Sequence, residues 1–327
     1  MSDEERESAT KLSPIGVIGL GRLGRGIVAA LLGSGRKVIA FDTNPTAAEE
    51  TRRFAAHALE EMKAQGCSHL QPNQDGTKLL SIAASLDEFA GCEFLIESVV
   101  ESAAVKELLF DAVEGLVDPK TVIASNTSAL PITGLQRERK NPERFVGMHW
   151  AEPAYATRFL EVIRGEQSAD WAVEAALGLG TQAGKQPCLV KNDLPGFIVN
   201  RLGYALYREA AHLLELGVGD VETIDRAFRN AVGLWATLCG PFRWIDITGG
   251  VELYARAMTP VLPTLSNVDQ VPANFAARMG DSAEQSFYNY GEGEREQWQK
   301  LLHEHAWEMR RVMEHYDPLA APGKNMQ

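Results

Sequence analysis

The sequence predicts an α/β protein in which a doubly wound, mostly parallel sheet is followed by an all-helical C-terminal domain. Three observations support this prediction. The apolar run from Ile15 to Leu20 leads through closely spaced glycines into a helical pattern, as in a strand, turn and helix. Short apolar strands then alternate with helical patterns up to about residue 190, and this alternation indicates a parallel sheet. Beyond residue 192 the apolar residues keep helical spacing almost to the end of the chain.

The glycines of the first turn match the spacing G-x-G-x-x-G. Gly19 permits the tight turn, Gly21 lets the backbone approach a pyrophosphate, and Gly24 lets the helix pack on the strand. The start of the helix offers phosphate its unpaired N–H groups and the positive end of its dipole. A tight turn without a ligand is the alternative, but the flanking strand and helix favour a Rossmann-type dinucleotide site. The residues expected to bind the cofactor in this turn are Gly19, Leu20, Gly21, Arg22, Leu23 and Gly24.

Asp42 indicates which dinucleotide binds. It follows the second strand, Val38 to Phe41, at about 20 residues past the glycines, where an acid meets a ribose hydroxyl. A carboxylate at this position hydrogen-bonds a 2′-hydroxyl and repels a 2′-phosphate. The expected cofactor is therefore NAD rather than NADP.

The remaining elements of the first domain follow in order along the chain. Helical patterns cover residues 45–65, 102–116 and 168–184, residues 71–76 form a loop, and strand patterns cover 79–83, 92–100, 122–125, 144–149, 159–164 and 187–190. The strands at 144–149 and 159–164 are separated by about nine residues, whereas a parallel crossover needs about a dozen or more. These two strands are therefore expected to be antiparallel.

The domain boundary is expected near residue 192. Residues 13–191 form the predicted NAD-binding Rossmann domain, and residues 192–327 form a helical domain for substrate binding and dimerisation, with helices at 197–216, 221–231, 250–262 and 294–316. Long helices with apolar stripes need a partner surface, which predicts a homodimer formed through this domain. Residues 1–12 are polar and charged and are expected to form a disordered tail.

Composition argues against several classes of partner. A formal net charge of −12 disfavours nucleic acid or an anionic membrane as the main partner. The four cysteines are scattered without a C-x-x-C motif, as expected for reduced thiols in a cytoplasmic protein. No signal peptide or membrane span is apparent, and no metal site is predicted.

The chemistry is expected at the carboxyl ends of the strands, where open α/β sheets bind their ligands. His149 closes one apolar strand, and Glu161 lies on the neighbouring strand. Antiparallel pairing brings them side by side, and a carboxylate on one imidazole nitrogen leaves the other nitrogen basic. Such a pair can remove the hydroxyl proton as hydride leaves carbon. The alternatives are a core histidine that caps a strand and an edge-strand acid that faces water.

These residues resemble the L-3-hydroxyacyl-CoA dehydrogenase family over about residues 14–255. Besides the glycine turn and the pair His149 and Glu161, the resemblance rests on sequence blocks that fall in the order of the family. They are E-S-V-V-E at 97–101, S-N-T-S at 125–128, L-P-G-F-I-V-N-R at 194–201, and Gly240-Pro241-Phe242 with Asp246.

The resemblance implies NAD-dependent oxidation of the 3-hydroxyl of an L-3-hydroxyacyl substrate to the 3-keto product. His149 would be the general base and Glu161 its orienting partner, while Ser128 would bond the substrate oxygen. Asn200 would hold the substrate or the developing oxyanion from the second domain. Glu101 and Lys106 would help hold the ribose and phosphates on the nicotinamide side, and Asn126 and Ser128 are also expected at the cofactor. The family implies a homodimer formed through the helical domain.

The chain departs from the family pattern at three places. Glu152 stands where members that act in fatty-acid oxidation have an amide near the nicotinamide. The segment 47–65 is not rich in lysine, although a 3′-phospho-ADP group would favour positive charge there. The C-terminal G-K-K-T-G-x-G-F-Y ending is replaced by a long helix, which looks more like the lambda-crystallin/L-gulonate 3-dehydrogenase branch, with carnitine dehydrogenase nearby.

Three functions therefore remain open. The first is an L-3-hydroxyacyl-CoA dehydrogenase, and the second is a dehydrogenase of a free 3-hydroxy acid such as L-gulonate, carnitine or 3-hydroxybutyrate. The third is a non-catalytic, crystallin-like structural or NAD-sensing protein. The presence of His149, Glu161, Ser128 and Asn200 argues against the third function.

Overall fold

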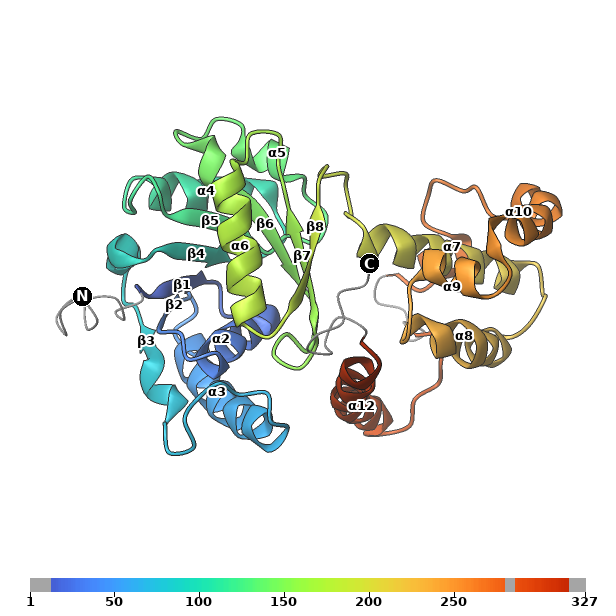
Figure 1. Cartoon of the computed structure of the whole chain (residues 1–327), viewed down its shortest axis with the longest axis horizontal. Coiled ribbons are helices and arrows are strands. Elements are labelled where there is room, and N and C mark those ends of the chain that lie inside the picture. Colours follow the sequence, from blue (N-terminus) through green and yellow to red (C-terminus); the bar gives the residue numbers. More distant parts are fainter. Residues whose placement is uncertain (1–12, 280–285, 318–327) are drawn as a thin grey trace. The chain divides into compact units, whose positions relative to one another are not determined.

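The computed structural model describes residues 13–279 and 286–317 (Figure 1). The predicted tail at residues 1–12 lies outside the described residues. The chain divides into two compact units, Met1–Asn200 and Arg201–Gln327. The first unit is an α/β domain and the second is helical, so the predicted fold class is confirmed.

The first unit is built on one eight-stranded sheet with the order β3-β2-β1-β4-β5-β6-β7-β8. Every strand pair is parallel except β6 with β7, which is antiparallel as the short connection predicts. The strands are β1 (Ile15–Ile18), β2 (Val38–Phe41), β3 (Leu80–Ile82), β4 (Phe94–Glu97), β5 (Val122–Ser125), β6 (Phe145–Trp150), β7 (Phe159–Ile163) and β8 (Gln186–Val190).

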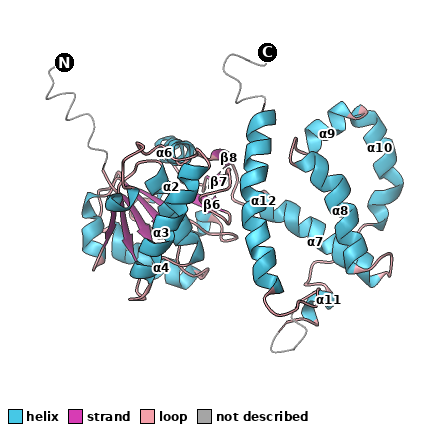
Figure 2. Ribbon diagram, turned by 90° about the horizontal axis from the view of Figure 1, so that it is seen from below, coloured by secondary structure: helices cyan, strands magenta, loops and turns pink. Residues whose placement is uncertain are grey.

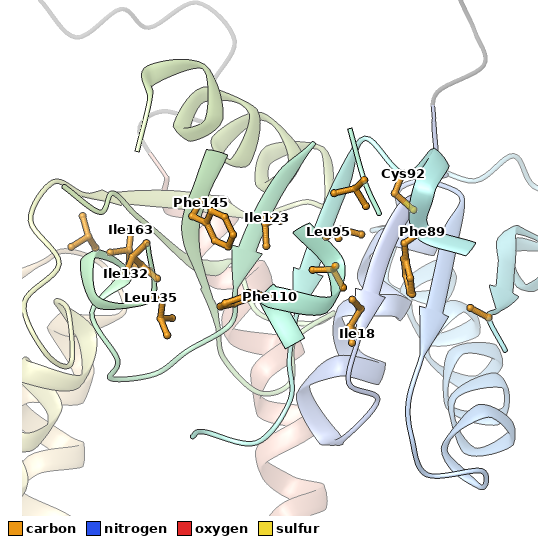
Figure 3. Packing of buried hydrophobic residues seen from close by; sticks show 14 of the residues in the cluster. Ile18, Phe89, Cys92, Leu95, Phe110, Ile123, Ile132, Leu135, Phe145 and Ile163 are labelled. Atoms are coloured by element: carbon orange, nitrogen blue, oxygen red, sulfur yellow. The ribbon is translucent and has the colours of Figure 1, made fainter. Parts of the chain in front are cut away.

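Helices cover both faces of this sheet. They are α2 (Arg22–Gly33), α3 (Ala47–Ala64), α4 (Ala103–Glu114), α5 (Ile132–Gln136) and α6 (Asp170–Gln182). Ile163 of β7 packs in one core cluster with Phe110 of α4 and Ile132 of α5 (Figure 3). A Cβ on Gly180 of α6 would overlap Leu160. Because side chains alternate along a strand, Leu160 and Ile163 point to opposite faces, and α6 therefore covers the face opposite to α4 and α5.

The cluster in Figure 3 shows why the strands are continuous apolar runs. Leu95 of β4 and Ile123 of β5 are each 1% exposed, and Phe110 is fully buried. Phe110 meets Phe145 of β6 edge to face, with ring centroids 5.3 Å apart. The central strands β1, β4, β5 and β6 are covered on both faces and bury every residue, which is why they are apolar runs.

Several predicted boundaries shift in the structure. The strand expected at 92–100 is only Phe94–Glu97, because Leu86–Gly91 forms a 3₁₀ helix before it and the chain turns after Glu97. The helix expected from residue 45 begins at Ala47. A short 3₁₀ helix at Gly76–Leu79 precedes β3, so that strand begins one residue late.

The second unit contains only helices and loops within residues 201–279 and 286–317 (Figure 2). The helices are α7 (Val199–Glu215), which begins in the first unit, α8 (Val221–Ala236), α9 (Pro241–Ile247), α10 (Gly250–Val261), α11 (Ala273–Ala276) and α12 (Glu294–Tyr316). The sequence did not indicate α9 as a separate helix. No residue of α8, α9 or α10 is buried, and Phe242 is 83% exposed.

Among the described helices, none combines the length and the apolar character that a membrane span needs.

Candidate active site

Two glycines of the first turn are required by the packing of the protein itself. Gly19 has a φ of +95°, and its N–H donates to the carbonyl oxygen of Phe41 at 2.9 Å. A Cβ on Gly19 would overlap the carbonyl of Ser98, and a Cβ on Gly24 would overlap the carbonyl of Gly19. Position 19 therefore requires glycine both for its positive φ and for lack of space for a Cβ. Gly24 allows the close approach of α2 to the end of β1.

Nothing within the protein itself requires glycine at position 21. It is the N-cap of α2 with a φ of −62°, and a Cβ built on it meets no atom within 4 Å. The first turn of α2 contains no acid, and no side chain caps its N–H groups. An open approach to unpaired N–H groups at a helix start fits a bound pyrophosphate. Arg22 and Leu23 lie in this first turn, as predicted from the motif.

Asp42 is held rigidly at the end of β2. Its Oδ2 accepts a hydrogen bond from the N–H of Leu20 at 2.6 Å, and its Oδ1 accepts from the N–H of Asn44 at 2.7 Å. The carboxylate is half-buried and is fixed to the backbone of the glycine turn. Each carboxylate oxygen keeps a further lone pair, so Asp42 can still accept hydrogen bonds from ribose hydroxyls.

A buried ionic network lies behind the ends of β4 and β5. Lys106 of α4 is fully buried, with its Nζ 2.7 Å from Glu97 Oε1 and 3.4 Å from Glu101 Oε2. Ser125 Oγ donates to the other oxygen of Glu97 at 2.6 Å. Lys106, which the resemblance expects to help at the cofactor, has a side chain with no exposed surface and fixes Glu97 and Glu101.

Glu101 organises the loop that contains Ser128. Its Oε1 accepts hydrogen bonds from Thr127 Oγ1 at 2.6 Å, from the N–H of Ser128 at 2.9 Å and from the N–H of Ala129 at 3.1 Å. Burial raises the pKa of Glu101, but the hydrogen bond from Thr127, the charge of Lys106 and the two N–H donors outweigh burial. The pKa of Glu101 therefore lies below its ordinary value, and the carboxylate stays charged.

The amide of Asn126 links neighbouring strand ends. Its Nδ2 donates to Ser98 Oγ at 3.0 Å, and its Oδ1 accepts from the N–H of Trp150 at 3.0 Å. Asn126 thereby ties the end of β5 to β4 and β6, next to His149. The exposed Ser128 follows two residues later, and its carbonyl oxygen accepts from Asn200 Nδ2 at 2.8 Å. Asn200 is the last residue of the first unit, so the structure places it on this unit rather than on the second domain.

His149 and Glu161 are directly opposite each other in the antiparallel pair of β6 and β7. His149 Nδ1 lies 2.9 Å from Glu161 Oε2, and the side chains are 8% and 1% exposed. Because a carboxylate only accepts hydrogen bonds, Nδ1 donates, and the neutral ring keeps Nε2 unprotonated. The geometry is that of a base whose tautomer is fixed by an acid.

The second oxygen of Glu161 is held by the backbone. Glu161 Oε1 accepts from the N–H of Ile198 at 3.0 Å and from the N–H of Val199 at 2.9 Å, at the start of α7. Burial raises the pKa of Glu161, but the hydrogen bonds from His149 and from these two N–H groups outweigh burial. The pKa of Glu161 lies below its ordinary value, so the acid remains a carboxylate beside the imidazole.

Sequence reasoning missed two aromatic residues beside His149. The rings of Phe159 and Phe197 have their centroids 5.7 Å and 6.0 Å from that of His149. Phe197 is 3% exposed and has a φ of +50°, which is unusual for a bulky residue. The only signal in the sequence was the break Leu194-Pro195-Gly196 just before a helical pattern.

The predicted site residues thus form three connected groups in the first unit. Asp42 is joined to the glycine turn, and Ser128 is joined to Glu101 and Asn200. The third group is the pair of His149 and Glu161. Within residues 13–279 and 286–317, no group of three or more His, Cys, Asp or Glu residues is arranged to hold a metal ion.

Comparisons with known proteins show which protein family the chain resembles. The family model "3-hydroxyacyl-CoA dehydrogenase, NAD binding domain" matches residues 14–194, and the model of the C-terminal domain of the same family matches residues 196–290. The chain is also similar to several curated dehydrogenases.

The chain is 36% identical to 5-formyl-3-hydroxy-2-methylpyridine 4-carboxylate 5-dehydrogenase of Mesorhizobium japonicum. This match of 257 residues covers 79% of this chain and 82% of the relative. A solved structure of a dehydrogenase of this substrate, described as an NAD⁺-dependent dismutase, has a TM-score of 0.85 at 32% identity and covers 93% of this chain and 99% of that one. The chain is 31% identical to L-carnitine dehydrogenase of a Pseudomonas species, over 83% of this chain and 88% of the relative. It is 35% identical to 3-hydroxybutyryl-CoA dehydrogenase of Bradyrhizobium diazoefficiens, over 68% of this chain and 75% of the relative.

Proposed function

The chain belongs to the 3-hydroxyacyl-CoA dehydrogenase family and is an NAD-dependent dehydrogenase, and from this premise we propose that it oxidises the hydroxyl of a small, free hydroxy acid. His149 is the general base in this proposal, and Glu161 orients it. The observation that carries the proposed reaction is the bond of 2.9 Å between His149 Nδ1 and Glu161 Oε2 in a buried setting. It leaves Nε2 as the one basic atom of the ring.

The chain's own residues manage the proton in this reaction. Nε2 of His149 takes the hydroxyl proton of the substrate, and the carboxylate of Glu161 stabilises the imidazolium that forms. Ser128 and Asn200 hold the substrate oxygen, and Glu101 fixes the backbone of the loop that contains Ser128. NAD, when bound, supplies the acceptor for the hydride that leaves the carbinol carbon. In the reverse direction the imidazolium returns its proton to the carbonyl oxygen.

The charge of α3 favours a free acid over a CoA thioester. Its sequence contains four acids, Glu49, Glu50, Glu60 and Glu61, against three fixed cations, Arg52, Arg53 and Lys63. Arg53 is 3.9 Å from Glu49, and Glu50 is 3.3 Å from Arg25. A 3′-phospho-ADP group carries several negative charges and binds where cations are in excess. The names of the relatives from Mesorhizobium japonicum and Pseudomonas, a pyridine carboxylate and carnitine, also denote free carboxylates.

An L-3-hydroxyacyl-CoA substrate is the second candidate. It is supported by the similarity to the 3-hydroxybutyryl-CoA dehydrogenase and by the presence of Ser128 and Asn200 in the family order. In this case the acyl group would occupy the same site, and the nucleotide part of CoA would not bind along α3, because α3 has no excess of cations.

The two candidates are separated by kcat/KM for NADH formation. Purified protein with NAD⁺ is assayed against 3-hydroxybutyryl-CoA, free 3-hydroxybutyrate, L-gulonate and L-carnitine, with His149→Gln as the inactive control that should still bind NADH. The proposal expects a free acid to exceed the thioester by at least about tenfold, a difference of about 1.4 kcal/mol in transition-state binding. A tenfold advantage of the thioester instead supports the second candidate. NADH binding without turnover of any hydroxy acid or thioester supports a non-catalytic role.

We further propose a cytoplasmic homodimer formed through the helical unit. The four cysteines are free thiols, which is the state that a reducing compartment maintains. Phe242 at 83% exposed and Leu234 at 74% exposed belong to amphipathic helices that bury none of their own residues. Apolar surface of this extent is covered in stable proteins, and a second copy of the same helices provides the matching surface.

A further inference from the structure

The ring of Phe159 lies beside the imidazole of His149. The two ring centroids are 5.7 Å apart, and the ring planes are nearly perpendicular, at 87°. Phe197 also lies beside the imidazole, but it is 3% exposed and offers a ligand almost no surface. Phe159 is only half-buried, so part of its side chain can contact a molecule that is bound at the base.

The sheet register places Phe159 on the ligand side of His149. Phe159 is the first residue of β7, and His149 is opposite Glu161, two residues further along that strand. Because β7 runs antiparallel to β6, the start of β7 lies at the carboxyl end of β6. The strand β6 is parallel to β5, so this is the edge at which open α/β sheets bind their ligands. Phe159 therefore lies at the ligand edge of the sheet, beyond the base.

Phe159 also points to the same face of the sheet as the residues of the reaction centre. Side chains alternate along a strand, so Phe159, Glu161 and Ile163 share one face. Ile163 packs in one core cluster with residues of α5, and the loop that contains Ser128 leads into α5. A substrate hydroxyl held between Ser128 and His149 thus has Phe159 beside it on the same face.

We propose that Phe159 is a specificity-determining residue that selects substrates with a neutral, apolar arm. The carbinol carbon of a free hydroxy acid has one arm that ends in the carboxylate and one further arm. A carboxylate that faces a phenyl ring loses its hydration without gaining a hydrogen-bond donor, so the carboxylate arm lies away from Phe159. The further arm then lies against the ring, where burial favours methylene groups and disfavours hydroxyl groups.

A cationic arm gains less from this setting than a neutral arm of the same shape. An aromatic face can attract a quaternary ammonium group. The carboxylate of Glu161, however, is already matched by the imidazolium that forms as His149 takes the proton. The cation therefore loses hydration at the base without meeting an acid whose charge is left over. This inference deepens the proposed function, and it rests on His149 as the base.

The test compares substrates that differ mainly in the further arm, with NAD⁺ and the purified wild type. Because 3-hydroxyhexanoate has two methylene groups more than 3-hydroxybutyrate, its kcat/KM should be roughly tenfold higher. Its kcat/KM should also exceed that of L-gulonate, a six-carbon acid whose further arm contains hydroxyl groups, by more than about tenfold. The neutral isostere of carnitine, 3-hydroxy-5,5-dimethylhexanoate, should have a higher kcat/KM than L-carnitine.

The variants test whether this selectivity depends on the phenyl ring. Phe159→Ala should lower the ratio of kcat/KM between 3-hydroxyhexanoate and 3-hydroxybutyrate to below about threefold, because apolar surface at the further arm is lost. Phe159→Leu restores an apolar wall and should keep the ratio above about fivefold. Phe54→Ala is the matched control, because Phe54 is also half-buried and meets Tyr155 edge to face at 5.6 Å. Its ratio should equal that of the wild type.

An unchanged ratio in Phe159→Ala overturns the proposal, even if kcat/KM falls for both acids, because a purely structural role lowers both by one factor. A wild type that prefers L-gulonate or L-carnitine to its neutral counterpart also overturns it. If only thioesters are oxidised, the free-acid proposal fails, and the same ratio is measured with 3-hydroxyhexanoyl-CoA and 3-hydroxybutyryl-CoA. A ratio that falls in Phe159→Ala in that series supports the role of Phe159, and an unchanged one refutes it. A wild type that oxidises none of these acids or thioesters refutes both proposals.

Discussion

Replacing Glu161 by glutamine changes one atom of the dyad and tests the mechanism most directly. Glu161 accepts three hydrogen bonds, from His149 Nδ1 and from the N–H groups of Ile198 and Val199. The amide oxygen of glutamine can still accept from both N–H groups, which leaves its NH₂ group facing His149. An NH₂ group donates, so Nδ1 must become the acceptor and the proton of the neutral ring moves to Nε2. The base then presents a proton to the substrate instead of a lone pair.

The magnitudes follow from this geometry. Loss of the correct tautomer should lower kcat by about 10²–10⁴, the range of general acid–base catalysis. Loss of the charge-assisted bonds should lower the free energy of unfolding by about 1.5–3 kcal/mol at neutral pH. Because hydrogen bonds hold the folded pKa of Glu161 below its ordinary value of 4.5, its contribution to stability is present above pH 4.5. That contribution is lost as the pH falls through the folded pKa, so wild type and variant should converge in acid.

The assays are steady-state NADH formation at saturating substrate for kcat and urea unfolding between pH 3 and 8 for stability. Glu174→Gln, an exposed change on α6, is the matched control and should alter neither quantity. The affinity for NADH should be preserved in Glu161→Gln, because the residues proposed to bind the cofactor are others. A variant that keeps kcat within threefold of the wild type contradicts the assignment of His149 and Glu161. A stability difference that grows as the pH falls below 4.5 contradicts the assigned charge.

Four further predictions concern the cofactor, the substrate and the assembly. Asp42→Ala should lower the ratio of kcat/KM with NAD to that with NADP, because the acceptor for the 2′-hydroxyl is lost; an unchanged ratio refutes its role. Gly21→Ala should leave the melting temperature near that of wild type while weakening NADH binding, whereas Gly24→Ala should lower the melting temperature, since only the second Cβ meets backbone; equal melting temperatures would refute this. Asn200→Ala should lower kcat more than it raises KM, because a bond that strengthens in the transition state acts on kcat, and a change in KM alone would place it outside the chemistry. Light scattering at micromolar concentration should give a dimer, and a monodisperse monomer would reject the interface proposed for the helical unit.

The predictable part of the fold is the part fixed by short-range patterns. The first strand, turn and helix are evident in the sequence because the backbone itself requires Gly19 and Gly24. Asp42 is evident because a ribose-binding acid is expected directly after the second strand. The antiparallel pair of β6 and β7 follows from a connection too short for a crossover, and this pairing is what sets His149 opposite Glu161.

The remainder depends on contacts that no local pattern contains. Lys106 has helical spacing like any surface lysine, and its burial is apparent only when β4 and the loop at Glu101 close around it. The amide of Asn126 resembles that of any loop residue until Trp150 of another strand donates to it. The second unit was predicted as helices, but the extent to which their apolar faces are left uncovered depends on tertiary packing rather than on periodicity.

Phe197 shows how the dyad depends on the element that follows it. The first N–H groups of a helix have no partner within the helix, and at α7 two of the N–H groups at its start bond Glu161. Their convergence on one oxygen requires the chain to turn sharply just before them, and Phe197 makes that turn with a φ of +50° at a cost of about 1–3 kcal/mol. The same turn buries the phenyl ring beside His149, which excludes water from the imidazole. The strained residue therefore helps to fix the carboxylate of Glu161 and also shields from water the imidazole that we propose as the base. The same contacts thus stabilise the pair of His149 and Glu161 and the start of α7.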